Sequence, residues 1–505
     1  MIWACRLGFV AALAAFVSLA VARAIQDGVC CGDDALFAVA AKDVARGRGY
    51  PEGGDLDRER SYFGLPDARL SVGPVLVLPV AAAIRVLGNR HWVPGVASIA
   101  LWSILFVSVI GALRPFGDAG RRYVAAVLFL ALCYSFCAWH FEQWYAMLGE
   151  VPTSLLIWLA AAVWAARPRR RLNLSVASLL IGLACLTKLM AALCVPPFLA
   201  GVAMARGWRG RTRLRQAFRD VLASLAWTLL PAVLFQGYRA LAAGPRQYLA
   251  ENRQWLAFAL AQATAEQDSP GVLARASAYS RQAYERFGLG PSELLLLSTV
   301  ALLVIASRAR PTLRLQALVL LGCVMTNVAW WLLASKGRPR HLLIALVLTV
   351  AAAVLPLLAL RQPARALSYC LLLATCTAPN WARASHPLRH GPDGWFSPSA
   401  AVRNALAVAA RVDAAPPGMP VFGQWWATIA DLEYLSADVG RYGRLPDGAA
   451  PDAPAQYAIA SNARFQSKPD PAFEKRLASC RREEMDRLPY ELFWCGASEP
   501  SPPPR

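Results

Sequence analysis

Long apolar blocks alternate with short charged segments through the first 380 residues of the chain. The blocks are rich in Ala, Leu and Val, are long enough for helices that cross a bilayer, and lack the strict alternation of a membrane β-strand. The pattern predicts an α-helical polytopic membrane protein with about eleven transmembrane helices. The predicted spans are residues 7–25, 91–113, 122–140, 151–166, 173–187, 189–205, 220–237, 292–307, 315–334, 342–360 and 366–380.

The apolar segment "SVGPVLVLPVAAAIRVLG", residues 71–88, is treated as an exception. Counting it as a span would invert the orientation of every later helix, so we interpret it as a helix that lies in the membrane interface. The two short spans 173–187 and 189–205 meet at "LTKLM", and a lysine at that point predicts a broken hairpin near the outer surface.

Positive charge is concentrated in the loops that the span count places on one side of the membrane. Such a bias marks the cytoplasmic side, and it explains the net charge of +20 without nucleic-acid binding. The first outer loop is then residues 26–90, with interfacial helices, and a helical outer loop covers residues 238–291. The basic loops are residues 114–122, 166–171, 206–219, 307–314 and 361–365.

The two ends of the chain differ from the apolar core. The first segment ends in "ARA" like a signal peptide, and we interpret it as an uncleaved signal anchor. Residues 1–380 are predicted to form the membrane domain, and residues 381–505, with strand-like runs between polar segments, a small extracytoplasmic α/β domain. Cys480 and Cys495 lie in this tail, and the sequence leaves open whether they pair.

Two adjacent aspartates, Asp33 and Asp34, begin an amphipathic helix in the first outer loop, with Lys42 on its polar side. One aspartate is a common helix N-cap, and the helix dipole favours ionised carboxylates at this end. An ionised carboxylate at a membrane surface can also accept a proton from an attacking hydroxyl or amine. The local sequence leaves capping and catalysis equally open.

A second acidic segment, "WHFEQWYAMLGEVPTS", falls in the next outer loop at residues 139–154. Glu150 stands directly before an apolar span, where a carboxylate is costly unless it is paired or used, so we favour a functional role. His140 and Glu142 are candidate contacts for an acceptor substrate, although an interfacial position is the simpler interpretation for His140.

Cations provide the third group of candidates. Lys188 is flanked by apolar residues on both sides, which indicates a buried or pore-facing cation rather than a snorkelling one. A late loop predicted to lie outside contains Lys336, Arg338, Arg340 and His341. Basic residues there suit a phosphate-bearing lipid or leaving group, with simple headgroup contact as the alternative.

These motifs together resemble the GT-C membrane glycosyltransferases, in particular the protein O-mannosyltransferase-like enzymes and the lipid A aminoarabinose transferases. The shared features are an acidic pair on a short helix in the first outer loop, an interfacial helix with Gly-Pro near its start, an acid before a span in the second outer loop, a "G-x-x-x-x-T-K" break and a late basic loop. Here they correspond to Asp33–Asp34, "SVGPVLVLP", Glu150, "GLACLTK" and "SKGRPRH", where His341 replaces the usual Tyr.

The resemblance implies a reaction and its site residues. The donor would be a polyprenyl-phosphate sugar, and Asp33 would be the general base that deprotonates the acceptor, with inversion at the anomeric carbon. Glu150 would position the acceptor or share the base role, and Asp34 would orient Asp33. Some relatives use a divalent metal ion and others do not, so the cofactor stays open, with Asp34 or Glu150 as its ligand if one binds. The cations for the donor phosphate would be Lys188, Lys336, Arg338 and Arg340.

We therefore expect an inverting glycosyltransferase of the cytoplasmic (inner) membrane that works at the outer face. Its partners would be the lipid-linked donor, a lipid, glycan or protein acceptor, and the bilayer, with no nucleic acid. The alternatives are a flippase or transporter, which should carry ionisable residues at mid-span, and a polymerase or ligase for lipid-linked surface glycans.

Overall fold

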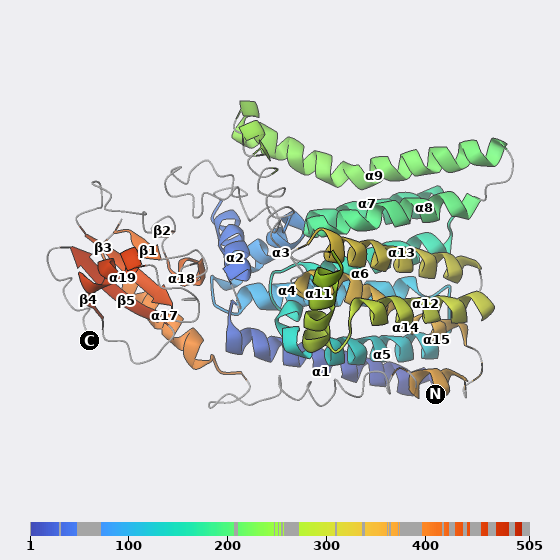
Figure 1. The fold of residues 1–505 in the computed structure, drawn as a ribbon, viewed down its shortest axis with the longest axis horizontal. Helices are drawn as coiled ribbons and strands as arrows, with labels where there is room; N and C mark the ends of the chain where they lie inside the picture. The colour runs from blue at the N-terminus through green and yellow to red at the C-terminus, as the bar shows by residue number, and fades with distance from the viewer. Residues whose placement is uncertain are drawn as a thin grey trace.

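A bundle of long helices forms one part of the molecule, and a smaller region with a β-sheet lies at one end of it (Figure 1). The computed structural model describes residues 2–29, 32–47, 72–206, 211–246, 248–250, 252–253, 256, 272–308, 311–335, 339–360, 362, 365–371, 373, 396–416, 419–423, 430–437, 442–444, 456–462, 471–483 and 490–496. Cys30 and Cys31 lie outside these ranges.

The helices of the bundle lie roughly side by side (Figure 1). Central helices are buried along nearly their whole length, whereas α9 lies at the edge and exposes apolar side chains suited to lipid. The bundle comprises α1 (Ile2–Asp27), α4 (Val93–Ala112), α5 (Ala119–Cys137), α6 (Glu150–Ala166), α7 (Arg171–Thr187), α8 (Val195–Arg206), α9 (Arg211–Ala243), α12 (Pro291–Arg308), α13 (Pro311–Leu333), α14 (Leu343–Val354) and α15 (Pro356–Ala359).

The lengths of these helices confirm a multi-pass membrane protein. Among the described residues, six helical segments are long and apolar enough to cross a bilayer, and a bent pair, 276–287 with 291–307, makes a seventh if it is one span. Four further apolar helical segments are shorter: Pro74–Leu87, α6, α7 and Leu189–Ala205. The number of about eleven spans stays a prediction.

Close helix crossings are built on small and hydroxyl side chains, as is usual within a membrane, where apolar contact alone gives little preference for a partner helix. On α7, a Cβ at Gly182 would lie 2.3 Å from the Thr228 carbonyl oxygen of α9. Beside it, the Ser178 and Ser224 hydroxyls hydrogen-bond at 2.6 Å. Any larger residue at position 182 would therefore separate α7 from α9.

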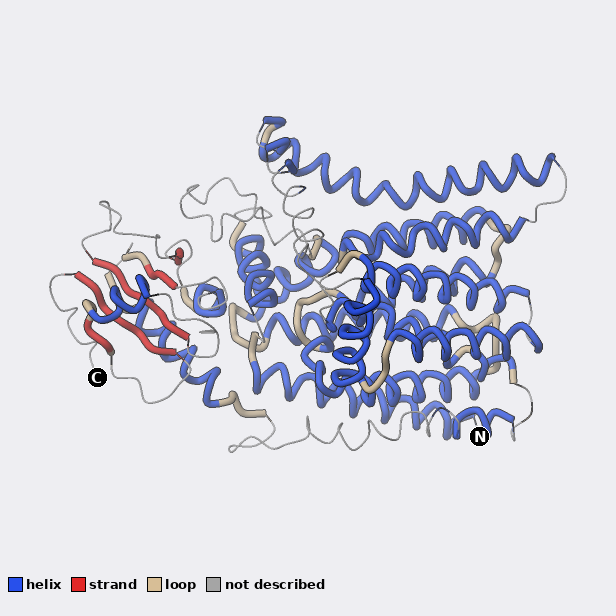
Figure 2. Tube along the Cα trace, in the orientation of Figure 1, coloured by secondary structure: helices blue, strands red, loops and turns tan. Residues whose placement is uncertain are grey.

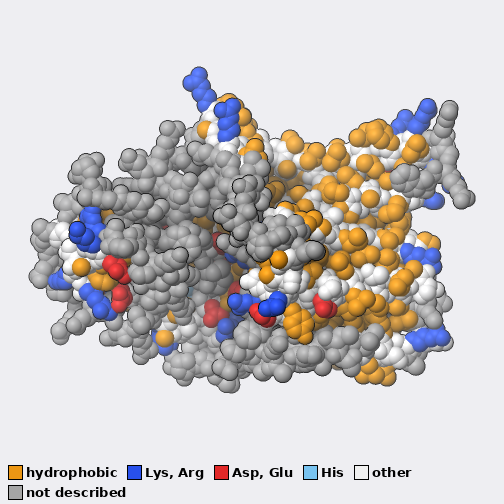
Figure 3. Space-filling view, in the orientation of Figure 1, with side chains coloured by type: hydrophobic (Ala, Val, Ile, Leu, Met, Phe, Trp, Pro, Cys, Tyr) orange, Lys and Arg blue, Asp and Glu red, His pale blue; other side chains and the backbone are white. Residues whose placement is uncertain are grey.

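The two ends of the bundle differ in charge. Arginine-rich segments at the junction of α4 and α5 (residues 114–122) and at the junction of α6 and α7 (residues 167–171) lie at the end that holds the chain's N-terminus (Figure 1). Lys and Arg side chains mark this end in Figure 3, and hydrophobic side chains cover the bundle beside it. The acidic candidates lie at the opposite end, as the loop pattern of the sequence predicts.

Short elements fill that opposite end, next to the sheet region. The interfacial helix predicted from residues 71–88 is α3 (Pro74–Leu87), which packs against α2 (Gly32–Ala45), α4 and α7. The other elements are η2 (Ala138–Trp144), η3 (Leu189–Cys194), η4 (Pro339–Leu342) and the amphipathic α11 (Val272–Phe287).

The C-terminal region contains a five-stranded sheet in the order β2-β1-β3-β5-β4. Strand β1 runs parallel to β2 and β3, and β5 runs antiparallel to β3 and β4. The three strand-like runs of the sequence correspond to β1, β3 and β5. The elements are α17 (Ala400–Asp413), β1 (Val421–Gly423), α18 (Ala430–Leu435), β2 (Tyr442–Arg444), β3 (Gln456–Asn462), α19 (Pro471–Ala478), β4 (Arg481–Arg482) and β5 (Tyr490–Gly496).

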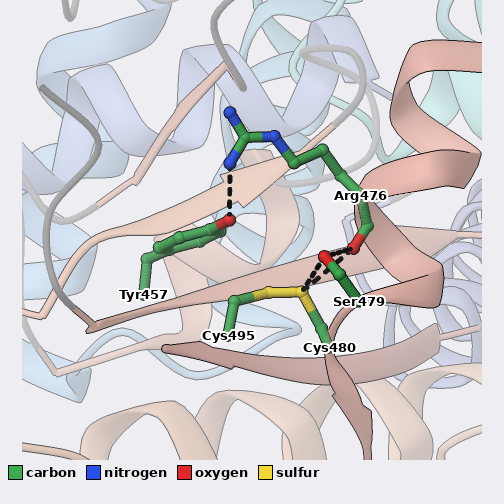
Figure 4. Close-up of a disulfide and its surroundings, with 5 residues drawn as sticks. All are labelled: Tyr457, Arg476, Ser479, Cys480 and Cys495. Carbon is green, nitrogen blue, oxygen red and sulfur yellow. Dashed lines mark hydrogen bonds between the residues drawn. A yellow bond between two sulfur atoms is a disulfide. The ribbon is translucent and has the colours of Figure 1, made fainter. Parts of the chain in front are cut away.

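A disulfide joins Cys480, just after α19, to Cys495 on β5, which resolves the pairing that the sequence left open (Figure 4). Arg476 of α19 donates a hydrogen bond of 3.0 Å to the Tyr457 hydroxyl on β3. The covalent link and this hydrogen bond therefore fix α19 to the same sheet.

Candidate functional site

The sequence-predicted carboxylates meet at the end of the bundle that faces the sheet. The N-termini of α2, α3 and α6 converge there with the C-terminus of α7 and with η4. Figure 2 shows α2 and α3 as short helices between the long bundle helices and the strands. Segments that are far apart in sequence are thereby brought into one site.

Two glycines let the backbones approach closely at this point. A Cβ on Gly73 would lie 1.7 Å from the Leu186 carbonyl oxygen, so only glycine fits between α3 and the end of α7. Gly149 adopts a φ of +86°, a left-handed conformation that glycine accepts without strain, and it turns the chain into α6. Both glycines lie beside Thr187, whose carbonyl accepts from the Gly73 N–H at 3.4 Å.

Lys188 and Glu150 form a buried ion pair. Helix α7 ends at Thr187, and the extended backbone of Lys188 forms a bridge with Val72. The Lys188 Nζ lies 3.1 Å from Glu150 Oε1 and donates to the Leu148 carbonyl at 2.9 Å. The two side chains are only 12% and 1% exposed. The "LTK" break therefore places a cation against the carboxylate that begins α6.

The second carboxylate oxygen of Glu150, Oε2, does not share the contact that Oε1 makes with Lys188. Glu150 Oε2 is buried and has no hydrogen-bond partner among the residues that the structure describes. A buried carboxylate oxygen in this state is costly and is expected where a substrate or water supplies the missing donor. Glu150 thus has one oxygen fixed by Lys188 and one available for a donor.

Asp34 ties α2 to the segment before α6. Its Oδ1 accepts a hydrogen bond of 2.7 Å from the Met147 N–H, and the residue is 2% exposed. The carboxylate therefore satisfies a backbone donor of a distant loop. This bond suits the supporting role that the resemblance implied for Asp34, and it fixes the N-terminal turn of α2.

Asp33 is the more accessible of the two aspartates and forms an ion pair with Arg340. Its Oδ2 contacts Arg340 Nη1 of η4, with the side chains 24% and 30% exposed. The pair joins the first outer loop to the late basic loop, two segments that the span count placed on one face. Lys336 and Arg338 lie outside the described residues.

The remaining candidates belong to the short helices η4 and η2. His341 follows Arg340 in η4, and its ring centroid lies 5.8 Å from that of Trp330. Glu142 is half-buried in η2, and His140 belongs to the same short helix. The structure thus locates these three residues without testing a substrate contact.

A divalent metal ion held by Asp34 or Glu150 stays a prediction from the sequence. Within the described residues, no three His, Cys, Asp or Glu side chains are grouped as metal ligands. Asp33 and Glu150 are each paired with a cation, and Asp34 accepts from a backbone N–H.

One residue near the site was misassigned from the sequence. The amphipathic pattern placed Lys42 on the polar side of the helix, which is wrong because its side chain is fully buried, 0% exposed. Its ammonium donates to backbone carbonyls of α18, nearly 400 residues later in the chain. A lone polar residue in a short helical pattern gives no signal of such a distant partner.

Comparison with known proteins rests on structure alone, because no protein-family model and no curated protein sequence matches the chain. ArnT from Cupriavidus metallidurans in the apo state aligns with a TM-score of 0.59 at 13% identity, over 98% of this chain and 100% of that one. The same protein bound to undecaprenyl phosphate gives 0.58 at 13% identity, over 97% and 98%.

A third similar structure is the archaeal oligosaccharyltransferase AglB from Archaeoglobus fulgidus, in complex with an inhibitory peptide and a dolichol-phosphate. It aligns with a TM-score of 0.50 at 12% identity, over 91% of this chain and 70% of that one. Likeness at such identity concerns the fold. The chain therefore shares its overall fold with these structures, in agreement with the fold that the resemblance implied.

Proposed function

We propose that the chain is an inverting glycosyltransferase that moves a sugar from a polyprenyl-phosphate donor to an acceptor at the outer face of the cytoplasmic membrane. The observation that carries the proposal is the accessible Asp33–Arg340 pair beside the buried Glu150–Lys188 pair. A GT-C fold holds both pairs, and one protein with this fold binds undecaprenyl phosphate.

Asp33 is the general base in this proposal. Its ionised carboxylate accepts the proton of an acceptor hydroxyl or amine as that atom attacks, a contribution of about 10²–10⁴-fold in rate. Arg340 neutralises Asp33 while no substrate is bound. When the donor phosphate binds Arg340, the contact with Asp33 is exchanged for one with phosphate, and the carboxylate becomes available to the acceptor.

Cations hold the donor phosphate and stabilise it as the leaving group. The acceptor atom forms a bond to the anomeric carbon while the bond from that carbon to the phosphate oxygen breaks. The electron pair leaves with polyprenyl phosphate, the acceptor proton passes to Asp33, and the anomeric configuration inverts. Arg340 and Lys188 stabilise the charge that develops on the leaving phosphate, together with Lys336 and Arg338.

Glu150 and Asp34 support the reacting groups. Because one Glu150 oxygen is fixed by Lys188 and the other is buried without a described partner, Glu150 is placed to accept a hydrogen bond from the acceptor. Asp34 keeps α2 against the Met147 backbone and so orients Asp33. No step of this mechanism passes through a metal ion.

Two features support an outer-face location. The arginine-rich turns lie at the end of the bundle away from the site, which is the cytoplasmic end by the positive-inside rule. The Cys480–Cys495 disulfide belongs to a region on the site's side, and disulfides persist in oxidising compartments. A lipid-linked donor also suits that face, where nucleotide sugars are absent.

The test is transfer in membranes from cells that express the chain, compared with empty-vector membranes. The probes are undecaprenyl phosphates that carry radiolabelled glucose, mannose, arabinose or 4-amino-4-deoxyarabinose, and label is followed into lipid, glycan and protein fractions. We expect excess label in one fraction together with released undecaprenyl phosphate. Equal incorporation in both membranes, or movement of the intact donor across the bilayer without release, would overturn the proposal in favour of a transporter.

A further inference from the structure

A buried lysine joins the helix that carries Asp33 to the C-terminal region. Lys42 on α2 is 0% exposed, and its Nζ donates two hydrogen bonds of 2.6 Å, to the Glu433 and Ser436 carbonyls at the end of α18. Helix C-termini leave their last carbonyls without partners inside the helix. Lys42 belongs to the first outer loop. It therefore donates to carbonyls at the end of α18 that cannot find a donor within that helix.

A second side chain from the membrane part contacts the same helix end. Asn89 Nδ2, just after α3, lies 3.1 to 3.3 Å from the Tyr434, Leu435 and Ser436 carbonyls. In return, the Tyr434 hydroxyl donates to the Arg90 carbonyl at 2.9 Å. The interface is thus directional, because donors and acceptors on both sides face one another.

The contact extends toward the proposed active site. Tyr434 is fully buried and shares an apolar cluster with Phe37 of α2, Val72 and Met147. Burial chiefly raises the pKa of the Tyr434 phenol, and the nearby Asp34 carboxylate raises this pKa further. The C-terminal region therefore packs against α2 through Tyr434, near the turn that carries the two aspartates.

Helix α2 is fixed at two places along its 14 residues. Asp34 binds the Met147 N–H in the first turn, and Lys42 binds α18 about 12 Å further along the axis, at 1.5 Å per residue. A helix this short is marginally stable by itself, so its place depends on the groups that hold it. Without the second attachment, α2 would still pack on α3, but only that packing and the Asp34 bond would set the position of its first turn.

The charge at Lys42 has a cost that an apolar residue would avoid. Burial chiefly lowers the pKa of Lys42 to about 8, Arg46 lowers it further, and Glu433, Asp43 and Asp413 partly oppose the change. Methionine would bury a side chain of similar length without a desolvated ammonium. What the lysine adds is its pair of directional hydrogen bonds to α18.

We propose that Lys42 is a positioning residue that fixes α2 on α18, so that the C-terminal region sets the position of Asp33. The role assigned to Asp33 rests on the proposed glycosyltransferase function. The attachment itself does not, because it is a property of the fold and can be measured without substrate. The C-terminal region then acts as part of the catalytic unit.

The experiment compares full-length wild type, Lys42→Met and, as a matched control, Lys475→Met, which changes an exposed lysine on α19. All are reconstituted in lipid nanodiscs. Amide hydrogen exchange is measured over residues 35–45 and over α6, and transfer is measured from the undecaprenyl-phosphate sugar that wild type uses.

The expected result for Lys42→Met is exchange about tenfold faster in α2 with α6 unchanged. We also expect a kcat at least about tenfold lower per folded protein with the donor KM within about threefold, as for an interaction that acts only in the transition state. A purely structural role would lower the yield of folded protein and leave its kcat intact. Unchanged exchange in α2, or an unchanged kcat, would overturn the proposal.

A milder variant covers the case in which Lys42→Met does not fold. Asn89→Ala removes the donor that follows α3 and keeps Lys42. A smaller increase in α2 exchange and a smaller fall in kcat than for Lys42→Met are expected, whereas wild-type values would overturn the proposal. If wild type transfers no sugar, the proposed function fails, and the exchange of α2 still decides whether Lys42 holds it.

Discussion

The Lys188–Glu150 pair offers a quantitative test of how the site is built. Lys188→Met removes the ammonium and leaves Glu150, 1% exposed, without the cation that lies 3.1 Å away. Removing one partner of a buried ion pair typically costs about 3–5 kcal/mol, because the other charge stays buried and uncompensated. The lost bond to the Leu148 carbonyl acts in the same direction.

Replacing the other partner of the pair should lower the free energy of unfolding by less. Glu150→Gln keeps the side chain's shape, and Lys188, at 12% exposure, retains its bond to Leu148 and some contact with solvent. We expect the free energy of unfolding to fall by about 1–3 kcal/mol. In the double variant Lys188→Met/Glu150→Gln no charge is left buried, so the loss should fall below the sum of the single losses by at least about 1–2 kcal/mol.

The assay is reversible unfolding by SDS in mixed micelles, followed by tryptophan fluorescence, with sugar transfer measured on the same samples. Stability should recover in part in the double variant while transfer stays lost, because neither group is then present for the substrate. Additive losses within about 0.5 kcal/mol would refute the reasoning, since independent sites behave in that way. Full activity in any of the three variants would refute the role of the pair in the reaction.

Three further outcomes are expected. Gly73→Ala should prevent the close approach of α3 to α7, because the added Cβ would lie 1.7 Å from the Leu186 carbonyl oxygen. The rate of sugar transfer should fall at least about tenfold, and a normal rate would contradict the geometry. Cys480→Ser/Cys495→Ser should lower the stability of the C-terminal region by about 2–4 kcal/mol, seen as faster hydrogen exchange in β5, and unchanged exchange would contradict this. The folded-state pKa of Lys42, about 8, lies below its ordinary 10.5, so the unfolded chain binds more protons than the folded chain between these pH values. The free energy of unfolding of wild type relative to Lys42→Met should therefore rise by about 2 kcal/mol from pH 7.5 to 9.5. A constant difference would contradict the burial of that charge.

The sequence was most informative about which membrane face the site residues share. The basic loops predicted the orientation of the spans, and this predicted orientation placed Asp33, Glu150 and Arg340 at one face before any contact was known. The structure brings Asp33 and Arg340 into an ion pair, in agreement with that reasoning. The helical membrane fold followed from the apolar blocks, and the GT-C resemblance followed from the order and spacing of the motifs at the outer face.

The individual pairings could not be obtained in this way. Lys188 was assigned to the donor phosphate, and nothing in "LTK" reveals that its extended backbone directs the ammonium to Glu150. The bond from Asp34 to the Met147 N–H depends on the path of a loop, which hydrophobic periodicity does not record. Both pairings are set by tertiary packing.

Lys42 shows the same limit most clearly. Its pattern is that of an exposed polar residue on a short helix, and its partners on α18 follow some 391 and 394 positions later. Burial of a charged side chain depends on the segment that covers it. Only the folded chain shows that the C-terminal region supplies that cover.

The most direct measurement of the central claim is the initial rate of sugar transfer by purified protein in proteoliposomes, for wild type, Asp33→Asn and Asp118→Asn. Asp33 is 24% exposed, so the asparagine variant should fold normally, and Asp118 is an exposed carboxylate at the opposite end of the bundle. Loss of the general base predicts a rate about 10²–10⁴-fold lower for Asp33→Asn, with Asp118→Asn within about twofold of wild type. Transfer by Asp33→Asn at the wild-type rate would contradict the account.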